Sequence, residues 1–324
     1  MSRKVSFETF FDHVANGRLA DVHRILDSGE VLVNRNLNDA LVRAAANGHV
    51  DVVDFLLRHA MFDPSADDNC AIRHAAFNGH IAVVERLLHD ERVDPSAANN
   101  HGVRWAAKNG RLAVVERLLQ DTRVDPSADN NYAVRQAARK GHLAVVEQLL
   151  QDKRVDPSAH NNYAVRQAGH GGHIAVVERL LRDDRVDPSA DDNNAVRWAG
   201  ANGHVAVVDR LLKDERVDPS VLGNHAIRMA AACGRFAVVD RLLEDDRVDV
   251  AVAIQSSRPE DVKRFECRER LTEICIALQD LELRRGSQSR FSTPLVRGRH
   301  CRSTASGIWC GVCAVKHYHD KKQQ

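Results

Sequence analysis

The residues best suited to chemistry in this 324-residue chain gather near its end. Cys310, Cys313, His317 and His319 follow the pattern Cys-x2-Cys-x3-His-x-His, and thiolates and imidazoles are ligands that Zn²⁺ accepts. The two histidines are closer together than in zinc fingers, and no apolar core accompanies them. A Cys-x-x-Cys pair also serves redox chemistry, but no βαβ pattern surrounds this one. The sequence therefore predicts neither a metal site nor a cofactor, and these four residues are the candidate ligands if a metal binds.

The seventeen histidines do not indicate an active site, because several recur at one position of a repeated unit. A residue that returns at the same structural position is expected to bond backbone between helices rather than to bind a ligand. The chain has no Gly-rich phosphate loop, no Gly-x-Ser-x-Gly and no His-Glu-x-x-His. We expect no enzymatic activity and no small-molecule substrate. The recurrent histidines each follow a glycine: His49, His80, His142, His173 and His204.

The elements that position these residues come from one unit that repeats every 31 residues. Such an internal repeat predicts stacked units in which each contacts only its neighbours, because one short unit encloses almost no core. A glycine marker keeps the same spacing from Gly17 to Gly234 without a slip. The tripeptide Asp-Pro-Ser begins at Asp63, Asp94, Asp125, Asp156, Asp187 and Asp218.

The residue pattern of one unit predicts a turn followed by two antiparallel helices. Pro fixes the turn, and the Asp and Ser beside it can bond neighbouring backbone. An Asn is expected to cap the first helix, and a left-handed glycine is expected to end it. Small residues line the inner face of this helix. The second helix is more apolar, with Ile81, Val84 and Leu87 on one side. The predicted structural residues are Asn69, Arg73, Gly79, Asn100, Arg104, Gly110, Asn131, Arg135 and Gly141.

The segment Ala75-Ala76-Phe77-Asn78-Gly79-His80-Ile81-Ala82-Val83-Val84-Glu85-Arg86-Leu87-Leu88 resembles the ankyrin-repeat core Ala-Ala-x-x-Gly-His-x-x-Val-Val-x-x-Leu-Leu. Two features depart from that family. Cys70-Ala71-Ile72-Arg73 replaces the usual Thr-Pro-Leu-His, and the unit is shorter than the family's ~33 residues. The Val-Asp-Pro-Ser turns are similar to those of arrays in amoebae and their large DNA viruses. The resemblance implies an all-α solenoid, with shortened projecting turns and a concave groove that binds another protein.

We divide the chain into an N-terminal capping repeat (1–34), an ankyrin-repeat array (35–250), a C-terminal capping helix (251–284) and a basic tail (285–324). An apolar stripe from Val262 to Leu281 predicts the capping helix. From Arg284 onward the chain holds nine Lys and Arg against the single acid Asp320, without a hydrophobic period. We expect this tail to be disordered. An alternative function is that it binds nucleic acid or an acidic surface while the array is a scaffold.

Composition limits the cellular setting. The chain has 46 Lys and Arg against 45 Asp and Glu, so its formal charge of +1 indicates no polyanion partner for the whole molecule. Seven cysteines form an odd set, and two of them, Cys70 and Cys233, lie too far apart in a stack to bridge. No signal peptide or membrane span is apparent. We expect an intracellular monomer with reduced thiols, cytoplasmic or else nuclear, that does not enter a membrane.

Recognition is expected at positions that vary from unit to unit while the scaffold repeats. The Arg column, which begins at Arg73, does not vary; we expect it to pair with the Asp of the Asp-Pro-Ser turns, with the acid at the Glu85 position or with backbone, rather than to track phosphates. Trp and Tyr at varying positions are typical binding anchors, although drift on a tolerant surface would look the same. The partner-binding candidates are His74, Phe77, Trp105, Lys108, Tyr132, Gln136, Arg139, Tyr163, Gln167, His170, Trp198 and Met229.

The repeat positions of two of these candidates predict the distance between them. Trp105 and Trp198 occupy the same position three units apart, so a stack that advances about 10 Å per unit would hold them some ~30 Å apart on one face. We expect both rings to lie free on the wall of the groove.

Overall fold

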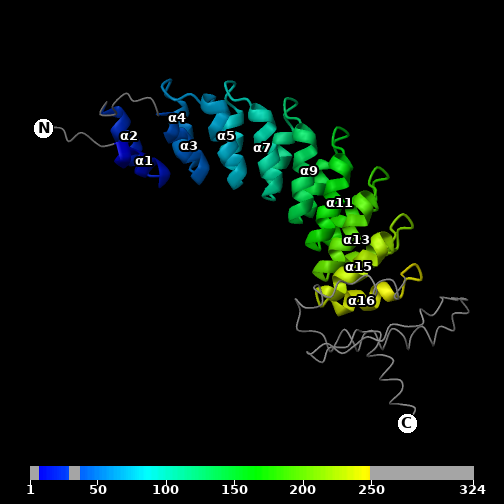
Figure 1. Ribbon diagram of the computed structural model, residues 1–324. Coiled ribbons are helices and arrows are strands. Elements are labelled where there is room, and N and C mark those ends of the chain that lie inside the picture. Colours follow the sequence, from blue (N-terminus) through cyan, green and yellow to red (C-terminus); the bar gives the residue numbers. More distant parts are fainter. Residues whose placement is uncertain (1–6, 29–36, 249–324) are drawn as a thin grey trace, which may run out of the picture.

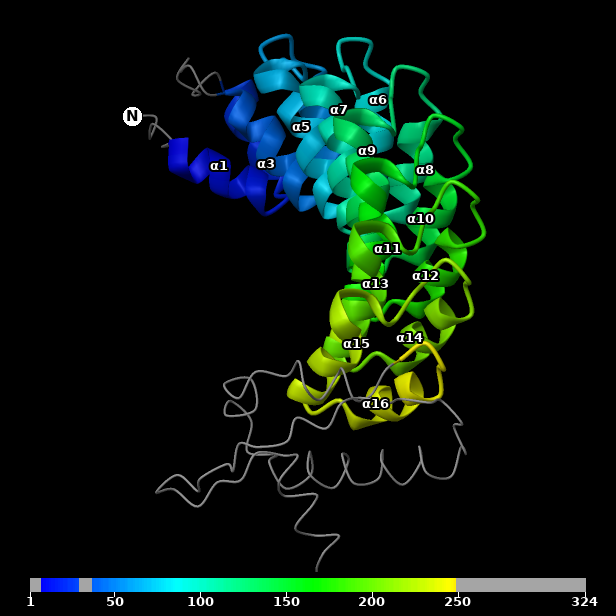
Figure 2. The same ribbon diagram turned by 45° about the vertical axis from the view of Figure 1, so that its right-hand side comes forward.

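A computed structural model describes residues 7–28 and 37–248 of the chain. This part forms eight consecutive helix pairs and contains no strand, as the repeat pattern predicts. The pairs stack side by side into a curved array that runs from the N-terminal α1 to α16 (Figure 1). The odd-numbered first helices line the inner side of the arc, and the even-numbered second helices form its outer side (Figure 2).

The first helices of the pairs are α1 (Phe7–Ala15), α3 (Asn38–Asn47), α5 (Ala66–Asn78), α7 (Ala97–Lys108), α9 (Ala128–Lys140), α11 (Ala159–Gly171), α13 (Ala190–Asn202) and α15 (Val221–Ala232). The second helices are α2 (Leu19–Asp27), α4 (Val50–Leu57), α6 (Ile81–Leu88), α8 (Leu112–Leu119), α10 (Leu143–Leu149), α12 (Ile174–Leu180), α14 (Val205–Leu212) and α16 (Phe236–Leu243). Helices α1 and α2 fall within the predicted capping repeat. The predicted capping helix (251–284) and tail (285–324) lie outside the described residues.

The core is continuous along the array, because each unit buries its apolar side chains against the next. In the α5–α6 unit, Ala75 and Ala76 of the first helix and Val83, Val84 and Leu87 of the second are fully buried. The principal helix contacts join each helix to its partner and to the equivalent helices of the neighbouring units. Small alanines bring the first helices close, while valine and leucine supply most of the apolar area that is removed from water.

The start of each first helix differs from the prediction. Three consecutive residues, Asp67, Asp68 and Asn69, adopt left-handed conformations with φ between 51° and 58° before the right-handed part of α5 begins. Asn69 does not cap its own helix: its Oδ1 accepts the backbone N–H of Asp94 in the next unit at 2.7 Å. The same bond joins Asn100 to Asp125 and Asn131 to Asp156. The Asn predicted as an N-cap therefore bonds the next unit instead of its own helix. It is buried and structural because it holds two units together.

The glycine that ends each first helix has a second role that involves the next unit. Gly79 and Gly141 are left-handed as predicted, with φ of 88° and 78°. A Cβ at Gly110 would lie 2.7 Å from Nδ1 of His142, so the glycine also makes room for the histidine of the following unit. Nε2 of His142 donates to the carbonyl of Lys108 at 3.2 Å, and His80 bonds Ala46 in the same way. The recurrent Gly-His pair thus joins adjacent units through backbone bonds.

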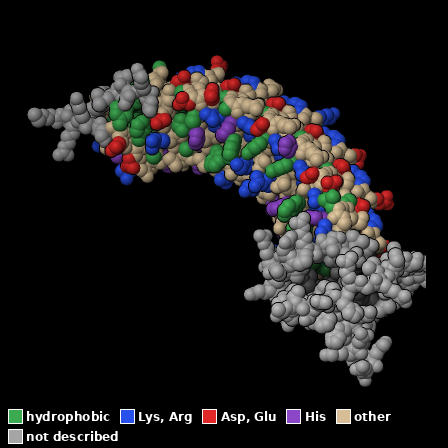
Figure 3. All heavy atoms as spheres, in the orientation of Figure 1, with side chains coloured by type: hydrophobic (Ala, Val, Ile, Leu, Met, Phe, Trp, Pro, Cys, Tyr) green, Lys and Arg blue, Asp and Glu red, His purple; other side chains and the backbone are tan. Residues whose placement is uncertain are grey.

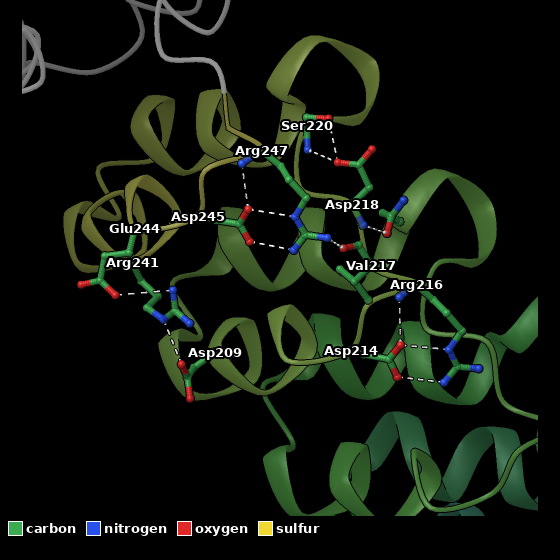
Figure 4. Close-up of polar contacts among 11 residues, drawn as sticks. Asp209, Asp214, Arg216, Val217, Asp218, Ser220, Arg241, Glu244, Asp245 and Arg247 are labelled. Carbon is green, nitrogen blue, oxygen red and sulfur yellow. Dashed lines mark hydrogen bonds and ion pairs between the residues drawn. The ribbon is translucent and has the colours of Figure 1, made fainter. Parts of the chain in front are cut away.

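An Asp-x-Arg pair in the connecting turn makes a further joint, which the sequence interpretation missed (Figure 4). Nε and Nη2 of Arg247 donate to the two carboxylate oxygens of Asp245 at 2.9 and 2.7 Å, and Nη1 donates to the carbonyl of Val217 in the preceding unit. Asp214 and Arg216 repeat this arrangement. The hydrogen bond from each arginine holds the pKa of its aspartate below the usual range. Equivalent Asp–Arg ion pairs begin at Asp90, Asp121, Asp152 and Asp183. The arginines that follow Asp90, Asp121 and Asp183 also bond a carbonyl of the preceding unit.

Within residues 7–28 and 37–248, no helix is long and apolar enough to cross a membrane.

Candidate protein-binding face

The inner side of the arc is the candidate binding face, because the first helices carry the varying positions there. Charged, hydrophobic and histidine side chains alternate along one face of the array (Figure 3). Of the predicted candidates, His74, Phe77, Arg139, His170 and Trp198 are exposed. A second group is half-buried: Trp105, Lys108, Tyr132, Tyr163, Gln167 and Met229.

Two expectations about these candidates are wrong. Gln136 is only 7% exposed, so it lies with the buried part of α9 and cannot offer its side chain freely to a partner. Trp105 is not a free ring, since it is partly buried by neighbouring side chains, whereas Trp198 remains 42% exposed. The two tryptophans share a sequence position but differ in their neighbours. Trp105 contacts side chains of its own helix and rings of both adjacent units, whereas Trp198 contacts the ring of His170.

Rings from consecutive units form an aromatic row that consists of Phe77, Trp105, Tyr132 and Tyr163. The ring centroids of Phe77 and Trp105 are 5.8 Å apart, and those of Trp105 and Tyr132 are 6.3 Å apart. The guanidinium of Arg135 lies 5.9 Å from the Tyr132 ring and 5.4 Å from the Tyr163 ring, and so connects them. Aromatic and cation–π contacts of this kind fix ring orientation in addition to burying area. The row is therefore an ordered surface along the inner face.

Trp198 forms a separate contact with the next ring on its N-terminal side. Its centroid lies 5.5 Å from that of His170 on α11. This pair leaves a large part of the indole in contact with solvent. An exposed tryptophan beside few covering groups is a typical anchor for a partner.

The Arg column has a structural task, although its main partners differ from the predicted ones. Nε and Nη2 of Arg73 donate to the carbonyls of Asp68 and Asp67 at 2.9 and 2.8 Å, and so hold the left-handed turn in place. Arg135 bonds the equivalent carbonyls of its own turn. The Asp of Asp-Pro-Ser does not pair with this column; Asp94, for example, accepts the N–H and Oγ–H of Ser96. The backbone interpretation is confirmed and that part of the pairing prediction is wrong.

Two arginines of the column also pair with an acid of the following unit. Arg104 forms an ion pair with Asp129, and Arg166 with Asp191. These acids stand at the first left-handed position of their turns, not at the Glu85 position. Arg104 and Arg166 are therefore already paired at the turn end of the inner face.

His101 is a functional candidate that the sequence interpretation did not select. Its ring stacks on Trp105 at 5.3 Å, and its Nδ1 is buried without a hydrogen-bond partner among the described residues. Burial, assisted by the charges of Arg73 and Arg104 and by His74, lowers the pKa of His101 to about 4. The ring is neutral at physiological pH. Its spacing of four residues from Trp105 on one helix was the signal in the sequence.

The predicted metal candidates Cys310, Cys313, His317 and His319 lie outside the described residues. Within the described ranges, no group of three or more His, Cys, Asp or Glu could hold a metal ion. Cys70 and Cys233 form no disulfide bond within the described part of the chain.

Comparison with protein families gives one match. A family model described as "Ankyrin repeats (3 copies)" matches residues 10–99 and 103–192. Together the two matches cover more than half of the chain, and they include the units that contribute the aromatic row. A search of curated proteins found no match.

Proposed function

The chain belongs to the ankyrin-repeat family, whose members generally act as protein–protein interaction modules, and we propose that it is a non-catalytic module that binds a partner protein on the inner face of its array. The observation that carries this proposal is Trp198, which is 42% exposed on α13 although the array buries its other large apolar groups on that helix pair. Folding does not need an indole in water, whereas a protein interface gains most from such an anchor.

The variation between units supports the same proposal. The Asn positions and the Asp-x-Arg pairs that join units keep the same residues, while the position of Phe77 becomes Lys108, Arg139 and His170 in later units. A rigid scaffold with variable side chains on one face can be specific for one partner without a change of fold.

A photo-crosslinking experiment tests the location. A photoreactive amino acid replaces Gln167 on α11 of the inner side or Ala175, an exposed residue of α12 on the outer side, in the full chain. In lysate of the source cell, we expect the Gln167 position to give a discrete adduct with another protein that the Ala175 position does not give. Adding Trp198→Gln should weaken the adduct at least about tenfold.

Two outcomes would contradict the proposal. Identical adducts from both positions would place the contact elsewhere on the array. An adduct that is insensitive to Trp198→Gln would show that the exposed indole is not an anchor.

A further inference from the structure

We infer that the segment which the inner face binds is an extended acidic peptide whose carboxylates recur at every third residue. This inference rests on the proposed function and deepens it, since it names the chemistry of the partner. It depends on three cations, Lys108, Arg139 and Lys140, which we call the cationic strip.

The cationic strip is electrostatically unmatched within the described part of the chain. Arg139 and Lys140 are exposed at the end of α9 and form no ion pair there. Lys108 has no carboxylate partner among the described residues either; its Nζ lies 3.8 Å from the centroid of Trp105. By contrast, Arg104 and Arg166 at the other end of these helices already hold Asp129 and Asp191.

No acid of the surrounding sequence neutralises the strip. Residues 105–109, 136–140 and 167–171, at the C-terminal ends of α7, α9 and α11, contain no Asp or Glu. Residues 111–113 and 142–144, where α8 and α10 begin, contain none either. Carboxylates of a partner would therefore meet unpaired cations, and charge complementarity of this kind selects partners and steers their association.

The register of the repeats predicts the spacing of the partner's charges. Lys108 and Arg139 occupy the same position of consecutive units, 31 residues apart. Neighbouring packed helices lie about 8–10 Å apart. An extended peptide in the polyproline II conformation has three residues per turn and rises about 9 Å per turn, so every third side chain returns to the same side. A carboxylate at every third residue would thus meet one unit after another. The side chains between them would contact the aromatic row, which contains Trp105 and Tyr132.

A peptide fits this face better than a nucleic acid does. Strong phosphate binding uses roughly 6–10 cationic contacts, more than the three that the strip supplies. Rings that take up bases need open faces, whereas Trp105 and Tyr132 pack against each other and against Lys108 and the arginines of the column.

Fluorescence polarisation with three labelled probe peptides tests the inference on the full chain. The first peptide carries Glu at every third position between Leu and Ser, the second has the same composition with its Glu residues clustered, and the third replaces Glu by Lys. A single-stranded oligonucleotide is the fourth probe. We expect the first peptide to bind at least about fivefold more tightly than the second, and the third to bind least of the peptides.

The variants use residues that the array itself places at these positions. Arg139→Ala with Lys140→Asn copies Ala201 and Asn202 of a later unit. Lys153→Thr with Arg182→Gln, which copies Thr122 and Gln120, removes the same charge from the turns after α10 and α12. We expect the first pair to weaken binding of the first peptide about fivefold, the size expected for two partly exposed ion pairs, and the control pair to change it less than twofold.

Each other outcome overturns the inference in a distinguishable way. Equal binding of the first two peptides refutes the spacing, and tighter binding of the Lys peptide refutes the charge. Binding that the inner-face variant does not weaken belongs to another basic part, such as residues 284–324. An oligonucleotide that binds more tightly than the peptides and responds to the same variant makes the partner a nucleic acid. If the peptides fail while the Gln167 crosslink persists, the proposed function stands without an acidic partner.

Discussion

At the scale of single residues, many side chains in this array are defined by the neighbouring unit rather than by their own. Gly110 illustrates this, because its left-handed conformation is a local requirement while its missing Cβ leaves room for His142 of the next unit. The sequence predicts the first requirement from the position of the glycine after a helix. The second needs the stacked structure, since the histidine lies 32 residues further along the chain.

Gly110→Ala tests how much the histidine contact matters. We expect it to lower the free energy of unfolding by about 2–3 kcal/mol, from the strain of a Cβ at positive φ and from the displacement of His142. Gly234→Ala is the matched control, because Gly234 has a similar φ of 67° and no described residue lies within 4 Å of a Cβ there. Urea denaturation measures both. Equal losses would show that strain alone requires these glycines.

His101 predicts a pH-dependent term in stability. The unfolded imidazole has a pKa near 6.5 and the folded one about 4, so between these values the unfolded state binds the proton and the folded state does not. Stability should therefore fall as the pH drops from about 6.5 to 4. We expect His101→Asn, which copies Asn194, to remove about 1 kcal/mol of this loss, a value reduced because water reaches part of the ring. Urea midpoints at pH 7 and 4.5 that shift equally in both proteins would contradict this.

At the scale of the elements, the helices were predictable and the turns that start them were not. The glycine marker and the apolar spacing of Val83, Val84 and Leu87 predict both helices of a unit, and these residues are buried. The left-handed run from Asp67 to Asn69 was missed, because three such residues in succession are rare outside specific contexts. The role of Asn69 was misassigned since its partner, Asp94, lies 25 residues away.

The candidate site was predictable to a smaller extent. The sequence identified the column that contains Trp105 and Trp198, yet exposure differs between them and Gln136 of the same column is buried. Exposure depends on side chains at other positions of the same unit and of adjacent units, which a single column does not contain. Local pattern could not reveal that Arg135 joins Tyr132 to Tyr163.

Asn131→Ala tests the bond between units. Its Oδ1 accepts the N–H of Asp156 at 2.7 Å, so the change leaves that donor without its partner and places Ala in a left-handed conformation. We expect a loss of about 2–3 kcal/mol in the free energy of unfolding. Asn130→Ala carries the same backbone strain at an exposed position, and should cost at least about 1 kcal/mol less. Similar losses in the two variants would mean that the joint contributes little.

At the scale of the whole molecule, the joints add up along the array and give it a common sensitivity to acid. The pKa of each aspartate in the six Asp-x-Arg pairs is lowered from 3.8, first by the hydrogen bond from its arginine. A carboxylate with a lowered pKa stabilises the fold at pH values above about 4, and this stabilisation is lost as the pH falls through the folded value.

We therefore expect the urea midpoint of the array to fall as the pH drops below about 4. Asp152→Asn should reduce this dependence by one carboxylate's share, since its pKa is held down by Arg154. Asp184→Asn, at an exposed acid without an ion pair in the described part of the chain, is the control and should leave the acid transition in place. A transition that keeps its full steepness in Asp152→Asn would contradict the assignment.

The bond from Asn to the next Asp has a consequence for how such a chain changes in length. Because successive units present the same acceptor on one side and the same donor on the other, they are interchangeable at their joints. Duplication or loss of a 31-residue block would leave complementary ends in register. The reach of the inner face can then grow or shrink by whole units while every remaining joint keeps its partners, so that a longer partner needs only a copied block and not a new fold.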